Sequence, residues 1–322
     1  MPDAASIARA VEVLRSGGLL GLPTETVYGL AVDASNPEAV ARMFAAKGRP
    51  ADHPVIVHLA SAAQIDDWAC DIPPLARRLA ATYWPGPLTL ILKRAPHVLD
   101  AITGGQDTVG LRIPAHPAAQ AVLAAFGGGV AAPSANKFGH VSPTTAAHVR
   151  EEFGAAVDLV LDGGACAVGI ESTIVACDGA GIRILRPGQI TSEMLARVAR
   201  IDNSESGAKP RVSGSLEKHY APRNRVAMAP ADHLADVIAR HPGRVAVLSR
   251  AKPAAARVRH WVAAADVEDY ARELYATLRD MDAAGCDLLL IETPPAGAAW
   301  EAVHDRLRRA AAGAGAASDS AN

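Results

Sequence analysis

The sequence predicts an α/β protein of two domains, and three observations support this. The chain has 322 residues, which is long for a single hydrophobic core. Short apolar runs of strand length alternate with helical segments. A polar stretch without periodicity separates two such regions. We expect a first domain over residues 1–200, a linker over 201–224, a smaller Rossmann-like domain over 225–312 and a disordered tail over 313–322.

The composition excludes several classes of protein. Hydrophobic residues make up 50% of the chain and charged residues 20%, which is typical of a globular protein. The net charge of -2 gives no general attraction to nucleic acid, although a local basic cleft is compatible with it. No apolar run approaches the ~20 residues needed to span a bilayer, and the N-terminus lacks the pattern of a signal peptide. We therefore expect a cytoplasmic protein without a membrane segment.

The four cysteines predict neither a disulfide framework nor structural zinc. Cys70, Cys166, Cys177 and Cys286 are scattered, with no Cys-x-x-Cys and no histidines at ligand spacing. Each is interpreted as a small buried hydrophobic residue in a protein of the reducing cytosol.

In the first domain, helical spacing and capping residues locate the helices. Ile7, Val11 and Leu14 repeat at helical spacing before Gly17-Gly18. Asn36-Pro37-Glu38 is a typical helix start, and that helix should end at Lys47. Further helices are predicted from a capping box at Ser61 and Gln64, over Pro74–Tyr83, and from Ser142-Pro143. Strands are predicted at 19–22, 55–59, 88–92, 108–113, 130–132, 157–161, 172–176 and 182–185, the last two as an antiparallel hairpin within a mixed sheet.

The second domain resumes the alternation beyond Arg225. Strands are expected at 244–248 and 287–291, with helices at 231–239, 267–281 and 298–310. No Gly-x-Gly-x-x-Gly follows a strand there, so a dinucleotide fingerprint is not predicted.

Two polar stretches follow strands or helices of the first domain. Lys47-Gly48-Arg49-Pro50 lies between a helix and a strand, and Pro133-Ser134-Ala135-Asn136 follows an apolar run. Open α/β sheets bind ligands at such strand ends. Two cations facing a hydroxyl and an amide suit an anionic, hydrogen-bonding substrate such as a nucleotide. The alternative is that the two cations only complement a helix dipole.

Other polar residues recur at strand ends, and each has a structural alternative. An arginine such as Arg112 or Arg186 is often a surface salt bridge. His58 in an apolar strand is often a satisfied core histidine, and Ser172 alone is an ordinary strand residue. No Walker loop, His-Glu-x-x-His or Gly-x-Ser-x-Gly is present. The recurrence of weak signals at one structural position favours a site.

In its order of motifs the chain resembles the threonylcarbamoyl-adenylate synthase family, the YrdC-like proteins, in their two-domain form. His219-Tyr220-Ala221-Pro222 resembles the signature of the two-domain branch. The matching strings of the first domain are Pro23-Thr24-Glu25-Thr26-Val27-Tyr28-Gly29-Leu30, Lys47-Gly48-Arg49-Pro50, Val57-His58, Trp84-Pro85-Gly86-Pro87-Leu88-Thr89, Val109-Gly110-Leu111-Arg112-Ile113-Pro114, Pro133-Ser134-Ala135-Asn136, Glu171-Ser172-Thr173-Ile174 and Leu185-Arg186-Pro187-Gly188.

The resemblance implies a YrdC-like twisted open mixed sheet and a reaction of L-threonine, bicarbonate and ATP. The products would be threonylcarbamoyl-adenylate and pyrophosphate, made for the N6-threonylcarbamoyl modification of tRNA. It also implies Mg²⁺ held mainly by ATP phosphates, hand-off to the tRNA threonylcarbamoyl transferase complex and weak RNA binding. The implied catalytic residues are Lys47, Arg49, Ser134 and Asn136. The implied threonine pocket is Thr26, His58, Arg112, Ala132 and Ser172. The implied nucleotide contacts are Arg49, His53, Thr108, Ser134, Ser142, Arg186 and Tyr220.

Elementary chemistry agrees with this division of roles. Lys47 and Arg49 can offset the repulsion between a carboxylate and the α-phosphate of ATP. Arg112 suits a bidentate grip on the threonine carboxylate. A pocket that hydrogen-bonds the threonine hydroxyl, through Thr26 or His58, would reject valine.

Two departures from the family pattern concern the nucleotide side. His53 stands where the family has asparagine, and Ser213-Gly214-Ser215 stands where Ser-Pro-Gly is common. The linker is predicted to act as a lid, with Tyr220 over the cleft. The rival interpretations are a non-enzymatic RNA-binding protein and a carbamoyl-transfer module like that of hydrogenase maturation proteins. The absence of aromatic stacking motifs, and of acylphosphatase and zinc-finger segments, weighs against them.

Overall fold

The computed structural model describes residues 2–50, 52–177, 181–202, 210–214, 219–255 and 257–313. The chain forms two compact units, Met1–Phe138 with Pro143–Ser215, and Gly139–Ser142 with Leu216–Asn322. Much of the predicted linker, the turn residues 178–180 and the predicted tail from residue 314 lie outside the described residues. Within the described ranges, no helix has both the length and the apolar character that crossing a bilayer requires.

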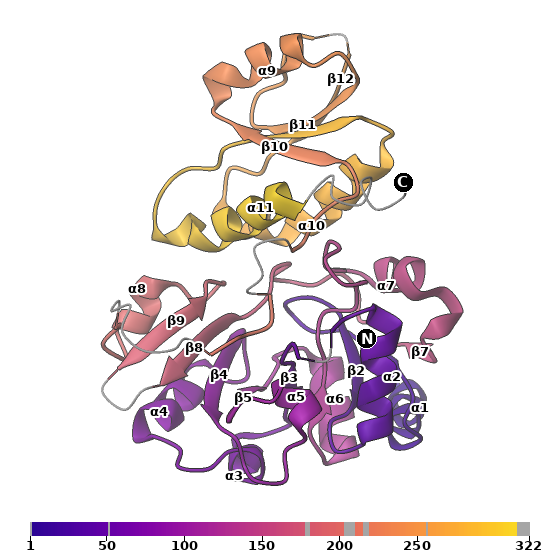
Figure 1. Cartoon of the computed structure of the whole chain (residues 1–322), viewed down its shortest axis with the longest axis vertical. Helices are drawn as coiled ribbons and strands as arrows, with labels where there is room; N and C mark the ends of the chain where they lie inside the picture. Colours follow the sequence, from indigo (N-terminus) through magenta and orange to yellow (C-terminus); the bar gives the residue numbers. More distant parts are fainter. Residues whose placement is uncertain are drawn as a thin grey trace. The chain divides into compact units, whose positions relative to one another are not determined.

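The first unit is built on a mixed sheet of nine strands (Figure 1). The strand order is β7-β1-β2-β6-β3-β5-β4-β8-β9. β3 is parallel to β5, and β4 is parallel to β8, while β8 and β9 form the predicted antiparallel hairpin. The strands are β1 (Leu20–Leu22), β2 (Gly29–Asp33), β3 (Ile56–His58), β4 (Leu88–Lys93), β5 (Thr108–Arg112), β6 (Val130–Ala131), β7 (Leu159–Val160), β8 (Thr173–Cys177) and β9 (Ile182–Arg186).

Local capping chemistry sets the helix ends of this unit. The Asn36 side chain accepts from Glu38 N and Ala39 N at the start of α2, as predicted. The predicted helix start at Ser142-Pro143 is wrong, because α7 begins at Ala146 and the Thr145 side chain is its cap. The helices are α1 (Ala4–Arg15), α2 (Pro37–Lys47), η1 (Ala62–Gln64), α3 (Ile65–Trp68), α4 (Pro74–Tyr83), α5 (Asp100–Thr103), α6 (Pro117–Phe126), α7 (Ala146–Phe153), η2 (Gly154–Ala156) and α8 (Ser192–Ala196).

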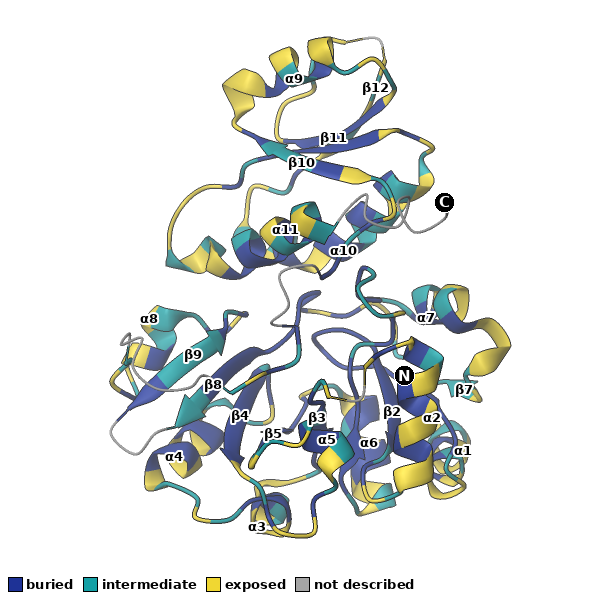
Figure 2. Cartoon of the chain, viewed as in Figure 1, coloured by how far each residue is buried: buried dark blue, intermediate teal, exposed yellow. Residues whose placement is uncertain are grey.

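Alternation along the strands divides the core of this unit between the two faces of the sheet. On β2, Leu30 and Val32 belong to one buried cluster, which also contains Val40 and Met43 of α2. The intervening Ala31 belongs to a second cluster with residues of α1 and α6. Successive residues of a strand point to opposite faces, so both faces of β2 are covered (Figure 2).

The second unit is a parallel sheet of four strands in the order β10-β13-β11-β12. Helix α9 covers one face and α10 and α11 cover the other (Figure 1). The elements are β10 (Arg225–Ala229), η3 (Ala231–His233), α9 (Leu234–Arg240), β11 (Val245–Ser249), β12 (Val258–Val262), α10 (Val267–Ala283), β13 (Leu288–Glu292), η4 (Ala298–Trp300) and α11 (Glu301–Gly313). This agrees with the predicted α/β rhythm.

Candidate active site

Lys47 joins the two polar stretches that the sequence singled out. It is the last residue of α2, and Gly48 ends the helix in the left-handed region at φ 62°. Lys47 Nζ donates to the backbone oxygens of Ser134 and Asn136, each at 2.5 Å. The Lys47 carbonyl accepts from Phe138 N at 2.9 Å. The helix end and the loop 134–138 therefore form one hydrogen-bonded element.

The charge of Lys47 is in an unfavourable environment. The side chain is 2% exposed. Burial lowers the pKa of Lys47 well below its ordinary value, and the charge of Arg49 lowers it further, while Glu152 opposes the shift. An anion brought to this point would relieve the penalty on both cations.

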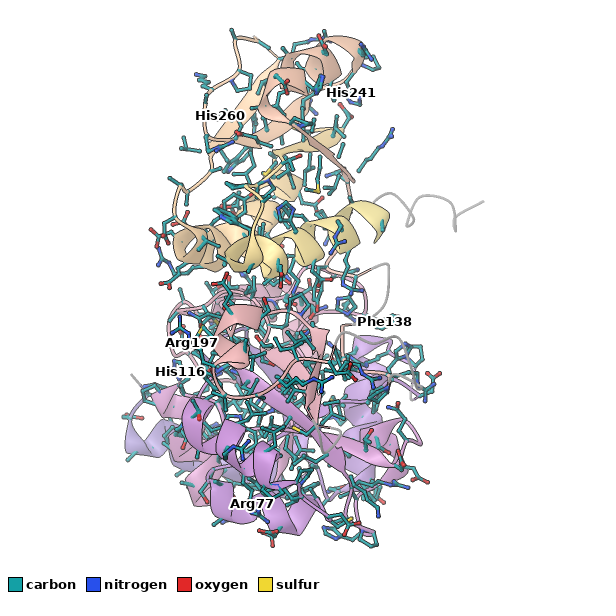
Figure 3. The ribbon with its side chains drawn as sticks, turned by 90° about the vertical axis from the view of Figure 1, so that its left-hand side faces the viewer. Arg77, His116, Phe138, Arg197, His241 and His260 are labelled. Carbon is teal, nitrogen blue, oxygen red and sulfur yellow. The ribbon has the colours of Figure 1, made fainter. Side chains whose placement is uncertain are left out.

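Arg49 and His53 extend the same wall. The Arg49 guanidinium is buried and Nη2 donates to the carbonyl of Pro54 at 2.8 Å. The His53 ring lies 5.4 Å from the ring of Phe138, which is labelled in Figure 3. His53 Nδ1 is 3.2 Å from Oδ1 of Asp52. His53 thus contacts the loop that Lys47 holds, on the side predicted for the nucleotide.

Three residues predicted to bind the substrate threonine lie on one face of the sheet: His58, Arg112 and Ser172. His58 of β3 is paired in register with Arg112 of β5, and both are buried. Thr89 of β4 is in contact with Ser172, the residue that precedes β8, through hydroxyl oxygens 2.8 Å apart. Residues paired across neighbouring strands point to the same face. The sheet therefore brings His58, Arg112, Thr89 and Ser172 to adjacent positions on one surface.

Arg112 is held by a residue that sequence reasoning left out of the site. Its Nη2 donates to Oε1 of Glu25 at 2.6 Å, its Nη1 to Oγ1 of Thr26 at 2.8 Å, and its Nε to the carbonyl of Gly86 at 3.2 Å. The other Glu25 oxygen accepts from Ala115 N at 3.0 Å. Three of the five guanidinium N–H groups are used, so a ligand carboxylate could take the two that remain. Glu25 lies inside the motif that carried the resemblance, but nothing in its spacing marked it as a partner of Arg112.

The hydrogen bonds around Thr24 and Thr26 show which donor and acceptor sites Thr26 can offer a ligand. Thr24 Oγ1 donates to the carbonyl of Val27 at 2.6 Å and lies 2.8 Å from Oγ1 of Thr26. Thr24 Oγ1 also accepts from the backbone N–H groups of Thr26 and Val27, at 3.2 and 3.3 Å, so both of its lone pairs are used and the Thr26 proton is not committed to it. Arg112 donates to Thr26 Oγ1, which leaves that oxygen one lone pair. A ligand hydroxyl at Thr26 can therefore donate to this lone pair or accept the Thr26 proton.

Ser172 and Arg186 form a second anchored pair. Arg186 donates from Nε and Nη2 to the carbonyl of Ser172, at 3.1 and 2.9 Å, and from Nη2 to the Ser172 hydroxyl at 3.1 Å. Gly188 makes the turn possible, since a Cβ there would lie 2.4 Å from Thr173 N. Arg186 also donates from Nη1 to the carbonyl of Ser213 at 2.9 Å. This arginine is a buried anchor and not the surface salt bridge of the alternative interpretation.

His58 lies in the core next to the backbone of Ile56 and Val130, but one of its ring nitrogens lacks a hydrogen bond. Its side chain is 3% exposed, and within the described part of the chain its Nδ1 has no hydrogen-bond partner. Burial lowers the pKa of His58 to about 3, and the positive charge of Arg112 adds to the shift. The ring is neutral at ordinary pH, and a buried Nδ1 without a partner can bond to a ligand.

Thr108 lies at the opposite, apolar end of the same sheet face. The hollow at this end encloses about 270 Å³, open in part to solvent, and is lined by Thr108, Gly110, Ile91, Ile174 and the linker residues 211–213. It is small for a nucleotide, since pockets for drug-sized ligands measure about 300–1,000 Å³. Val212 of the linker is 4% exposed and packs with Ile91 and Ile174. Residues 210–214 thus cover part of this face.

Three predicted site residues do not belong to this surface of the first unit: Ser142, Tyr220 and Ala132. Ser142 and Tyr220 belong to the second unit, so their part in nucleotide binding stays a prediction. Ala132 is buried after β6, and a Cβ at Gly29 would lie 2.9 Å from it, which makes it a packing contact of β2.

Comparison with known proteins identifies the family. A model described as "Telomere recombination" matches residues 12–188, and one described as "Threonylcarbamoyl-AMP synthase, C-terminal domain" matches residues 190–312. Threonylcarbamoyl-AMP synthase of Bacillus subtilis is 37% identical over 95% of this chain and 93% of its own length. The chain belongs to the threonylcarbamoyl-AMP synthase family. Its counterpart in Pyrococcus abyssi is 38% identical over 94% of this chain and 92% of its own length.

A solved structure supports the same family assignment. The crystal structure of Pyrococcus abyssi Sua5 complexed with L-threonine matches with a TM-score of 0.89 and 36% identity, covering 97% of this chain and 96% of that one. Escherichia coli YciO, at 24% identity and a TM-score of 0.51, shares the fold over 58% of this chain. The resemblance, the fold class and the enzyme class predicted from the sequence of this threonylcarbamoyl-AMP synthase family member are thereby confirmed.

Proposed function

We propose that this chain makes threonylcarbamoyl-AMP and pyrophosphate from L-threonine, bicarbonate and ATP. The observation that carries the proposal is the single sheet face that brings His58, Arg112 and Ser172 together beside Thr26. The free N–H groups of Arg112 suit the threonine carboxylate, while the Thr26 lone pair and His58 Nδ1 suit hydroxyl recognition.

The proposed chemistry has two steps. The threonine nitrogen first attacks the carbon of bicarbonate-derived CO₂, loses a proton and becomes an N-carboxylate. A carboxylate oxygen then attacks the α-phosphorus of ATP, and the bond from that phosphorus to the bridging oxygen of pyrophosphate breaks. Lys47 and Arg49 would offset the charge that builds on the phosphorus oxygens. Ser134 and Asn136 lie on the loop that Lys47 holds, so they would orient the phosphates.

Magnesium fits this site only as a companion of ATP. Within the described ranges, no group of three or more His, Cys, Asp and Glu side chains could hold a metal ion. Mg²⁺ prefers phosphate oxygens and water over an all-protein cage in nucleotide sites. We therefore propose that the ATP phosphates hold the ion and that Arg49, His53 and Thr108 contact the nucleotide.

The linker would act as a cover on the nucleotide side. Val212 packs on the sheet, and Arg211 is tied to Gln106 through both backbone groups, at 2.7 and 3.0 Å. A cover keeps water from the labile N-carboxylate and from the adenylate. We propose that Tyr220 completes this cover, and a chain that ends at Arg200 should consume ATP with less product.

The product would serve N6-threonylcarbamoyl modification of tRNA. We propose hand-off to the tRNA threonylcarbamoyl transferase complex, with weak RNA binding only, because the net charge of -2 supplies no general attraction. Cys70, Cys166 and Cys286 are free thiols, which fits the reducing cytoplasm.

The test is direct product detection. The protein is incubated with ATP, magnesium, bicarbonate and L-threonine, and threonylcarbamoyl-AMP is sought by mass spectrometry, with L-valine as the matched control. Product with threonine and none with valine is expected, and Lys47→Ala should abolish it while circular dichroism stays unchanged. Salt-sensitive RNA binding without threonine-dependent pyrophosphate release would overturn the proposal in favour of an RNA-binding protein.

A further inference from the structure

A short segment of the second unit lies in the chain between two parts of the first. Residues 139–142, the arch, belong to the second unit, while the chain before and after them belongs to the first. Before the arch, Phe138 N donates to the carbonyl of Lys47 at 2.9 Å. After it, the carbonyl of Pro143 accepts from Tyr28 N at 2.9 Å. Backbone hydrogen bonds within the first unit therefore fix the chain at both ends of the arch.

The arch connects residues for which a role at the nucleotide is proposed. It follows directly on the loop 134–138, which Lys47 holds, and it ends at Ser142. Ser142 is fully buried, and as the residue before a proline it is restricted to extended conformations. A segment this short between two fixed ends has few conformations. Whatever holds the middle of the arch therefore decides where Ser142 lies.

Within the second unit, Ala221 and Arg279 hold the middle of the arch. Ala221 N donates to the carbonyl of Gly139 at 2.8 Å, and His140 forms a parallel bridge with Ala221. Arg279 of α10 donates from Nη2 to the carbonyl of Val141 at 2.5 Å. Val141 is buried, so loss of this bond would remove a partner from a buried carbonyl, which is costly. A guanidinium donor also makes a stronger bond than a neutral one.

The arch and the stretch that pairs with it are contacted by the same side of α10. Tyr275 and Arg279 are about one turn apart on this helix, so their side chains lie on one side of it. The Tyr275 ring lies 5.6 Å from the ring of Tyr220, measured between centroids, and Tyr220 directly precedes Ala221. Helix α10 therefore supports both strands of the small bridge that contains the arch.

Tyr220 is held in a conformation that its own backbone disfavours. Its φ is 59°, in the left-handed region, which is unusual for a bulky residue. Its side chain is 1% exposed, and the guanidinium of Arg306 in α11 lies 5.3 Å from the centre of its ring. Packing by α10 and α11 thus offsets the backbone strain. The stretch that bonds to Gly139 is therefore a rigid support for the arch.

We propose that Arg279 is a positioning residue for the nucleotide, because it fixes the Val141 carbonyl and thereby holds Ser142 and the loop 134–138 in the arrangement that binds ATP. This inference rests on the proposed function, which places ATP at these residues. Arg279 acts through the arch and not by touching the substrate. The proposed threonine residues lie on other elements, on β3 and β5 and just before β8, so threonine binding does not depend on Arg279.

The experiment measures substrate binding to the full chain by isothermal titration calorimetry. Arg279→Met keeps an apolar stem and removes the donors. Arg272→Met is the matched control, because Arg272 is an exposed arginine of the same helix that pairs with Asp269, and both variants lose one positive charge. The Kd for Mg-ATP should rise about tenfold in Arg279→Met, through loss of a charged hydrogen bond, and stay unchanged in Arg272→Met. L-Threonine should bind all three chains equally, which also shows that the first unit is folded.

Hydrogen exchange gives a second measurement, which needs no variant. Mg-ATP should slow the exchange of the arch amides in the wild-type chain, and L-threonine alone should not. The proposal would be overturned by equal ATP affinity of the two variants, by a loss of threonine affinity in Arg279→Met as large as its loss of ATP affinity, or by arch amides that ATP leaves unchanged. Neither measurement depends on turnover. A wild-type chain that binds ATP and makes no threonylcarbamoyl-AMP would refute the proposed function and not the role of Arg279.

Discussion

Protonation of His58 should make the stability of the first unit depend on pH. The folded pKa is lowered to about 3 by burial and by Arg112, whereas an unfolded histidine titrates near ~6.5. Between these two pH values the unfolded chain binds a proton at His58 and the folded chain does not. The free energy of unfolding is therefore fully retained above pH ~6.5, and it decreases by about 1.4 kcal/mol for each pH unit below that value.

The size of the effect follows from this linkage. Relative to pH 8, the wild-type chain should lose about 2 kcal/mol at pH 5 through His58 alone. The variant His58→Gln cannot titrate at this position, so it should lose about 2 kcal/mol less than the wild type over the same range. Comparing the two chains cancels the contributions of all other groups that titrate alike in both.

The assay is urea unfolding at pH 8 and pH 5, in a background in which Trp261 and Trp300 are replaced by phenylalanine. Fluorescence then reports on Trp68 and Trp84, which lie in the first unit. Equal losses of unfolding free energy in wild type and His58→Gln would refute the reasoning, since they would mean that His58 gains its proton in the folded state.

Three further predictions concern buried anchors of the first unit. Glu25→Gln leaves the charge of Arg112 without its partner and should lower the free energy of unfolding by about 3 kcal/mol. It should also raise the KM for threonine more than it lowers kcat. An unchanged KM with normal stability would contradict a role of Glu25 in positioning Arg112. Gly188→Ala places a Cβ 2.4 Å from Thr173 N and should cost about 1–3 kcal/mol in urea unfolding, whereas Gly127→Ala, with open space around its Cβ, tests the strain of a positive φ alone. Lys47→Met removes donors from two buried carbonyls and should lower kcat about 100-fold or more, measured as pyrophosphate release; a smaller loss would exclude a role for this amine near the phosphates.

Much of the first unit was predictable because its signals are local. Asn36 caps α2, Gly48 ends it, and Lys47 is delivered at its last turn, all of which follow from side-chain chemistry within a few residues. The strands of the β8–β9 hairpin are close in the sequence, so their pairing was also predictable. The start of α7 was not, because Ser142-Pro143 and Thr145 both have the chemistry of a helix start, and only the fold shows that Thr145 is the cap.

The missed parts of the site depend on pairings that are distant in the sequence. Glu25, in the loop between β1 and β2, and Thr89 of β4 became site residues only because the fold places them next to Arg112 and Ser172. Strands β10 and β12 escaped prediction because Arg225–Ala229 and Val258–Val262 are short, with exposed positions that weaken their apolar pattern. Spacing predicted which residue types mattered, while strand order decided which of them meet.

The way Lys47 grips its loop has a consequence for how this protein can vary. Its side-chain nitrogen donates to the main-chain oxygens of residues 134 and 136, and every amino acid has such an oxygen. Side chains on that loop could thus be exchanged to alter what is recognised, with the tether to the helix kept. Lys47 itself cannot be exchanged in the same way, because its replacement would remove both of these hydrogen bonds to the loop at once.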